Sequence, residues 1–188
     1  MSIEALTVLL TLKRHGRMGR YSISSMTGLG EGVVRRILNE LRDQGAIRSL
    51  KGGAELTSKG EELLLRLLSD YGISQIDEGS DFAKLFNCEC KKCYMSVVKK
   101  DINEGDVVRL RDIAIKNGAD AALFLRYECS GNKFLILRLE KYLEDWDPEL
   151  GALLRNRFIN INCNDSVIVV CGPNDYQVLK SLISILRA

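Results

Sequence analysis

The sequence predicts an α+β protein made of two small domains, a helical domain with one short hairpin followed by a small α/β domain with one sheet of about four strands. Three observations support this prediction. The chain has 188 residues, which suits two small domains. Its hydrophobic fraction of 46% and charged fraction of 28% are ordinary for a globular protein. Helical and extended patterns succeed one another along both parts of the chain.

The first domain is expected to begin with three helices. Apolar residues recur at helical spacing over residues 3–10, and a glycine at position 16 ends the pattern. A short helix over residues 22–28 follows. The sequence Gly28-Leu29-Gly30 then predicts a turn into a longer helix over residues 31–44.

The longer helix has two different faces. Its apolar stripe contains Val34, Ile37, Leu38 and Leu41 at helical spacing, so this side faces a core. The opposite face offers Gly32, Arg35, Arg36 and Asn39 to solvent or to a partner.

A hairpin and a further helix complete the first domain. Residues 47–51 and 54–56 are short extended runs joined by Gly52-Gly53, a dipeptide suited to a tight hairpin. An apolar helix over residues 63–68 follows. Helix, helix, turn, helix, hairpin, helix is the order of a winged helix-turn-helix, so residues 1–70 are predicted to form one. In such a domain the third helix fits the major groove and the hairpin rests on the neighbouring backbone.

The stretch from Met26 to Ile47 resembles the winged helices of the multiple-antibiotic-resistance type of repressor. Many of these relatives have Ser or Thr where this sequence has glycine or Val33, so hydroxyl donors are missing here. The resemblance implies DNA contacts from the third helix, at Gly30, Gly32, Val33, Arg35, Arg36 and Asn39, and from the wing, at Arg48, Lys51 and Lys59.

Charge is distributed unevenly between the two parts. Residues 1–70 carry eleven Lys/Arg and eight Asp/Glu, whereas the remainder carries sixteen and seventeen, so the net charges are +3 and −1. The basic excess therefore lies in the first domain, as expected for a domain that binds nucleic acid.

After a predicted linker over residues 71–87, the second domain is expected over residues 88–188. Residues 111–119 and 165–170 resemble an archaeal family in which a winged helix precedes an α/β domain of unknown function. That resemblance implies a regulator-like architecture and supplies no activity. The expected strands cover residues 95–100, 121–129, 133–139 and 166–171, and the expected helices cover residues 106–117, a segment starting at 147, and 176–187.

Six cysteines lie in the second domain. Cys88, Cys90 and Cys93 fall within six residues and are predicted metal ligands, for zinc or an iron–sulfur cluster. A fourth ligand would come from one of the remaining three cysteines. The sequence shows no export signal, so a disulfide framework is not the first expectation. Redox-active or disulfide-bonded cysteines and inert thiols are the alternatives.

These features together predict a cytoplasmic transcriptional regulator that binds double-stranded DNA as a homodimer. The second domain would sense a small effector, a metal or a redox state, or would dimerise. The sequence contains a single histidine, His15, and no paired catalytic carboxylates, so an enzyme is not expected. Two alternatives stay open, an RNA- or protein-interaction adaptor and a metal-dependent enzyme built on the second domain. No membrane association is expected.

Overall fold

The first 70 residues contain four helices and one two-stranded hairpin in the computed structural model, which describes residues 2–188. Local signals set several boundaries. The Ser2 hydroxyl accepts a hydrogen bond from the N–H of Ala5 at the start of the first helix, and Gly16 follows its last residue. In chain order the elements are α1 (Ile3–His15), α2 (Arg20–Thr27), α3 (Glu31–Asp43), β1 (Ile47–Leu50), β2 (Gly53–Leu56) and α4 (Ser58–Asp70).

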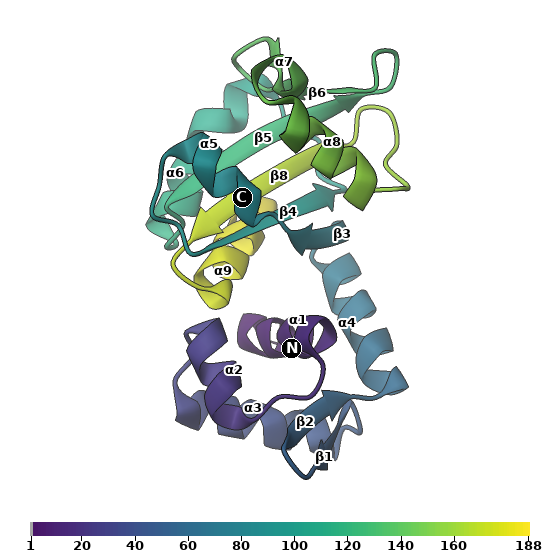
Figure 1. Cartoon of the computed structure of the whole chain (residues 1–188), viewed down its shortest axis with the longest axis vertical. Coiled ribbons are helices and arrows are strands. Elements are labelled where there is room, and N and C mark those ends of the chain that lie inside the picture. Colours follow the sequence, from purple (N-terminus) through teal and green to yellow (C-terminus); the bar gives the residue numbers. More distant parts are fainter. Residues whose placement is uncertain (1) are drawn as a thin grey trace.

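Helix α1 is buried along most of its length. All of residues 5–12 are buried, including Thr7 and Thr11, whose hydroxyls donate to the carbonyl oxygens four residues earlier. A helix that is buried on every side needs partners all round it. Helix α1 has them because it packs against α2, α3 and α4 and also against the last helix of the chain (Figure 1).

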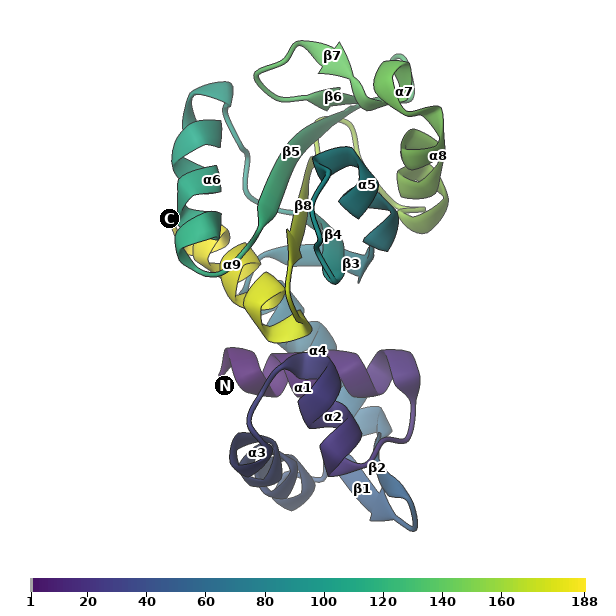
Figure 2. The same cartoon turned by 60° about the vertical axis from the view of Figure 1, so that its left-hand side comes forward.

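The second half consists of one sheet with helices on both of its faces (Figure 2). Its elements are β3 (Ile73–Glu78), the 3-10 helix η1 (Ser80–Phe82), α5 (Ala83–Phe86), β4 (Lys92–Val98), the 3-10 helix η2 (Glu104–Asp106), α6 (Val107–Lys116), β5 (Ala121–Glu128), β6 (Lys133–Ile136), β7 (Lys141–Tyr142), α7 (Leu143–Trp146), α8 (Pro148–Arg157), β8 (Ser166–Gly172) and α9 (Asp175–Arg187).

The sheet has the order β3-β4-β8-β5-β6-β7, and all neighbouring strands are antiparallel. Strand β8 lies in the middle and every one of its residues is buried, which explains its continuous apolar sequence. Helices α6 and α9 cover one face of the sheet, and α5, α7 and α8 cover the other (Figure 2).

Two expectations about this half were wrong. The sheet has six strands rather than four, because β3 and the two-residue β7 add an edge on each side. The predicted linker over residues 71–87 instead contains β3, η1 and α5. Strand β3 escaped prediction because it is an edge strand with a polar sequence, Ile-Ser-Gln-Ile-Asp-Glu, and its pairing with β4 supplies its stability.

The buried apolar residues form two clusters. One cluster runs from α1 and the other first-half elements through α9 to the α6/α9 face of the sheet, so it belongs to both halves. The other fills the opposite face of the sheet and contains no residue before Phe82. The two halves are therefore stacked end to end, with α3 and the hairpin β1–β2 at the end of the molecule away from the sheet (Figures 1 and 2).

Candidate nucleic-acid interface

The turn between α2 and α3 is built from two glycines and a buried leucine. Gly28 has φ of 75° and ψ of 7°, a left-handed conformation that favours glycine, and its N–H donates to the carbonyl oxygen of Ser24. Leu29 is buried, while the Ser24 hydroxyl donates to its carbonyl oxygen at 2.6 Å. Gly30 is the N-cap residue of α3. These contacts fix the angle at which α3 leaves α2.

Helix α3 buries one side and exposes the other. Val34, Ile37 and Leu41 are buried, which confirms these members of the predicted apolar stripe, and Leu38 is half-buried against the same core. Of the residues predicted to meet DNA, Val33 is half-buried, and the others are exposed, namely Gly30, Gly32, Arg35, Arg36 and Asn39.

The two adjacent arginines of α3 differ in their partners. Arg36 forms an ion pair with Glu40, with 2.7 Å between Nη1 and Oε1. Arg35 makes no ion pair or side-chain hydrogen bond with any residue that the structure describes. Asn39 is also engaged, because its side-chain oxygen accepts a hydrogen bond from Arg42 at 2.9 Å. The free guanidinium on this helix face is therefore that of Arg35.

Gly30 and Gly32 leave bare backbone at the exposed N-terminal end of α3. A Cβ atom added at either position would meet no heavy atom within 4 Å among the described residues. Packing within the chain therefore does not require glycine at these two positions. What glycine does provide is room for another molecule to approach the backbone closely.

The hairpin β1–β2 carries paired and unpaired cations. Arg48 lies directly across from Glu55 in the strand register and donates to it at 2.6 Å, and Arg17 donates to the other oxygen of the same carboxylate at 3.0 Å. These two hydrogen bonds lower the pKa of Glu55. Lys51 is exposed at the hairpin turn, and its amine has no partner within residues 2–188.

A third chain segment lies beside the hairpin. Met18 forms an antiparallel bridge with Ala54, with two backbone hydrogen bonds of 2.9 Å. Sequence analysis missed the contribution of this segment because one bridge within a short link has no periodicity. Its cations are Arg17 and Arg20, and the guanidinium of Arg20 lies 4.9 Å from the ring centre of Tyr21, whose side chain is 65% exposed.

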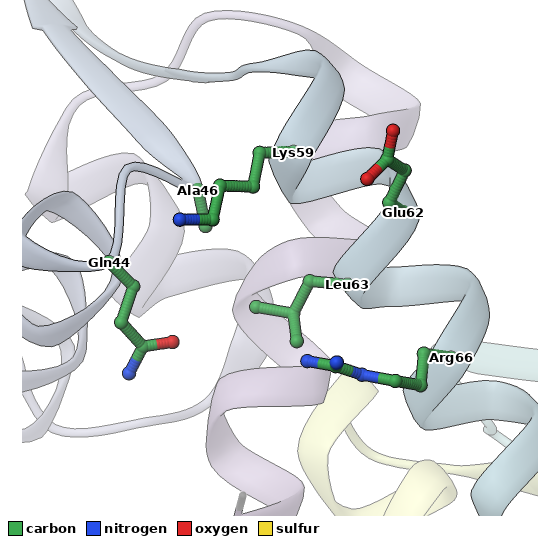
Figure 3. A pocket seen from close by; sticks show the side chains of 6 residues that line it. All are labelled: Gln44, Ala46, Lys59, Glu62, Leu63 and Arg66. Atoms are coloured by element: carbon green, nitrogen blue, oxygen red, sulfur yellow. The ribbon is translucent and has the colours of Figure 1, made fainter.

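Lys59 lies in the first turn of α4, three residues after the end of β2. It lines a hollow of about 330 Å³ together with Gln44, Ala46, Glu62, Leu63 and Arg66. In Figure 3 the side chains of Lys59 and Arg66 both extend from α4 toward the segment that follows α3. Lys59 therefore lies at the base of the hairpin, beside the segment that follows α3.

The start of α9 touches the first half at two points, and Tyr94 of β4 makes a third contact beside it. The Asn174 side chain lies so close to Gly28 that a Cβ atom there would be 2.4 Å from its Cγ. The Tyr176 hydroxyl donates to Glu4 at 3.3 Å. Asp175 is buried and accepts a hydrogen bond of 2.7 Å from Tyr94, whose ring lies 4.1 Å from the Arg14 guanidinium. Burial raises the pKa of Tyr94. The second half thus contacts the α2–α3 turn directly.

The prediction of a zinc or iron–sulfur site at Cys88, Cys90 and Cys93 was wrong. Within residues 2–188 no group of three or more His, Cys, Asp or Glu side chains has an arrangement that could hold a metal ion. All six cysteines are instead paired, as Cys88–Cys90, Cys93–Cys171 and Cys129–Cys163. Strand β4 begins at Lys92, which places Cys93 opposite Cys171 in the sheet register and leaves the other two in the preceding loop.

Comparison with known proteins gives a family and a structural relative. A family model described as "Domain of unknown function (DUF4443)" matches residues 89–187. A solved structure described as "Hypothetical protein PH0730 from Pyrococcus horikoshii OT3" is similar to 99% of this chain and 91% of that chain, with a TM-score of 0.71 and 27% sequence identity. No curated protein matches. These findings agree with the predicted likeness to archaeal proteins of unknown function, whereas the likeness of the first half to repressors stays a prediction.

No helix within residues 2–188 combines the length and the apolar character needed to cross a bilayer.

Proposed function

Because the chain belongs to the family of the domain of unknown function DUF4443, which brings no activity with it, we propose a function from the geometry of the first half. The protein is a transcriptional regulator that binds double-stranded DNA. Residues 2–70 act as a winged helix-turn-helix, with α3 in the major groove and the hairpin β1–β2 against the adjacent backbone.

One observation carries this proposal. Helix α3 presents the unpaired Arg35 beside two glycines with open space around them, at the end of the molecule farthest from the sheet. An arginine that is free of carboxylates is available to contact a guanine edge or a phosphate. Bare backbone at the start of the same helix lets a DNA strand come close. Lys51 at the hairpin turn supplies a second free cation.

The paired residues have a different role in this proposal. Arg36 and Arg48 are each held by a carboxylate, so their contribution to DNA binding is offset by Glu40 and Glu55. The net charge of +3 over residues 1–70 is small, which points to recognition by a few well-placed groups rather than by a broad basic surface.

We also propose that the regulator acts as a homodimer, with the second half as its sensing or dimerisation domain. A single short helix reads few base pairs, and two half-sites one helical turn apart raise affinity and specificity together. The contacts of the first turn of α9 with Gly28 and Glu4 provide a path from the second half to the α2–α3 turn.

The test is selection of bound duplexes from a random pool with the full chain, followed by competition against structured RNA and single-stranded DNA at one salt concentration. We expect enrichment of an inverted repeat and preference for duplex DNA. Preferential binding of RNA would favour the adaptor hypothesis. Absence of any enriched sequence, together with no duplex binding at low salt, would overturn the proposal.

A further inference from the structure

The disulfide Cys88–Cys90 differs from the other two in the length of chain that it closes. Its cysteines are separated by 2 positions in the sequence, against 78 for Cys93–Cys171 and 34 for Cys129–Cys163. In the chain-entropy model a disulfide stabilises a fold by restricting the unfolded chain, and the effect grows with loop length. Cys88–Cys90 therefore contributes least to the stability of the fold.

The same disulfide lies where a reactant can reach it. Cys88 and Cys90 are half-buried in the segment between α5 and β4, which has no regular secondary structure. Cys93 and Cys171, in contrast, are 0% exposed within the sheet. The Cys88 sulfur is 3.9 Å from the carbonyl oxygen of Ala83, so a thiol formed there already has an acceptor for its S–H.

The charges beside Cys88–Cys90 favour thiolates more than those beside the exposed pair Cys129–Cys163. Lys91 directly follows Cys90, is exposed, and has no side-chain partner within the described residues, so its charge offsets that of the exposed Glu89, which lies between the two cysteines. Cys129 follows Glu128, a carboxylate that disfavours a neighbouring thiolate. A nearby cation lowers the pKa of a thiol, and a nearby anion has the opposite effect.

We propose that Cys88 and Cys90 form a reversible thiol–disulfide exchange site that accepts two electrons from a dithiol. One thiolate of the dithiol attacks the Cys90 sulfur, the Cys88–Cys90 bond breaks, and Cys88 leaves as a thiolate that takes up a proton. The second thiolate of the dithiol then attacks the other dithiol sulfur, the one bonded to Cys90 in the mixed disulfide. Cys90 leaves as a thiolate and is protonated. The protein gains two electrons and two protons, and the dithiol becomes a cyclic disulfide.

The exchange site is connected to the start of α9 by a short path. The backbone N–H of Lys91 donates to the carbonyl oxygen of Gly172 at 3.2 Å, and the Lys92 amine lies 4.0 Å from Asp175. The first turn of α9 contacts the α2–α3 turn. An effect of the exchange on DNA affinity rests on the proposed function, whereas the exchange itself does not.

Graded reduction of the intact, oxidised protein tests the inference. The folded chain is equilibrated with increasing dithiothreitol, alkylated with iodoacetamide and mapped by peptide mass spectrometry. We expect Cys88 and Cys90 to become labelled together at about tenfold lower dithiol concentration than any other cysteine. The double variant Cys88→Ser/Cys90→Ser should lose this first step, and the matched control Cys129→Ser/Cys163→Ser should keep it.

Two results would overturn the inference. One is labelling of Cys129 and Cys163 before or together with Cys88 and Cys90. The other is protection of all six cysteines until the protein unfolds, followed in parallel by circular dichroism. Because no DNA is present, neither result depends on whether the first half binds a duplex.

Discussion

The two halves of the chain bury their apolar residues in different ways. Residues 2–70 are mostly helical, contain no cysteine, and share their core with α9 of the second half. The second half has a six-stranded sheet and all three disulfides, and one of its two cores belongs to it alone. The core of a region of about 70 residues rarely supplies more than about 3–5 kcal/mol by itself, and the first half has no disulfide to add to it.

This difference suggests how the molecule works. The first half gains part of its stability from the second, through the same helix whose first turn touches the α2–α3 turn. The helices that support α3 therefore pack directly against the second half through α9. A change at the start of α9 would reach α3 through packed side chains.

The largest expected effect is a loss of stability that distinguishes the core shared by both halves from the core of the second half alone. Leu182 of α9 belongs to the shared cluster and Leu154 of α8 to the other, and both are 0% exposed. Either change to alanine should cost about 2–5 kcal/mol. Hydrogen exchange should show that Leu182→Ala lowers protection in α1 as well as in the sheet. Unchanged protection of α1 in that variant would show that the first half does not depend on α9 for its stability.

A smaller effect isolates the contact between the halves. Gly28→Ala places a methyl group at positive φ and within 2.4 Å of the Asn174 side chain, whereas Gly72→Ala has a similar φ of 78° and open space around it. Each should lose about 1–2 kcal/mol from backbone strain. Gly28→Ala should lose about 1 kcal/mol more because of the clash, measured by urea denaturation. Equal losses would show that Asn174 yields without cost.

Glu55→Gln should raise duplex affinity about threefold, because it frees Arg17 and Arg48 for phosphates. The same carboxylate predicts a pH effect. Its pKa is lowered by hydrogen bonds from Arg48 and Arg17, so it stays ionised until the pH falls through that depressed value. As the pH falls through that value, duplex binding should strengthen in the natural protein and stay unchanged in the Glu55→Gln variant. Fluorescence anisotropy at several pH values measures both.

The smallest expected effect is at Gly32, where one substitution should raise stability and lower duplex affinity. A Cβ atom at this position meets nothing within 4 Å among the described residues, and alanine favours a helix more than glycine does. Gly32→Ala should therefore stabilise the protein by about 0.5 kcal/mol while weakening duplex binding. Stabilisation with unchanged affinity would remove Gly32 from the proposed interface.

Most elements of the first half could be predicted from the sequence because their signals are local. Gly16 and Gly28 end helices, and the apolar stripe of α3 has helical spacing. The hairpin was predicted with its turn one residue late, because Lys51 and Gly52 connect the strands and Gly53 already pairs with Leu50. The same applies to α8, where Asp147 caps the helix and Pro148 begins it. The pairing of Arg48 with a carboxylate was not predicted, because its partner Glu55 lies on the facing strand of the hairpin.

The errors in the second half arose from contacts between distant residues. Strand β3 depends on pairing with β4, and Cys93 meets a partner 78 residues away through the sheet register. The local spacing of Cys88, Cys90 and Cys93 suggested one metal site, but a strand start between the second and third cysteine separates them. A short motif gives no information about where the backbone changes direction.

Duplex affinity of single arginine variants, measured at several salt concentrations, tests the central claim most directly. We expect Arg35→Ala to weaken binding about tenfold or more, Arg36→Ala to have a smaller effect because Glu40 already holds that side chain, and the second-half control Arg111→Ala to have none. Equal losses of affinity in Arg111→Ala and Arg35→Ala, or unchanged and salt-steep binding by the Arg35 variant, would show that α3 is not the DNA-binding surface.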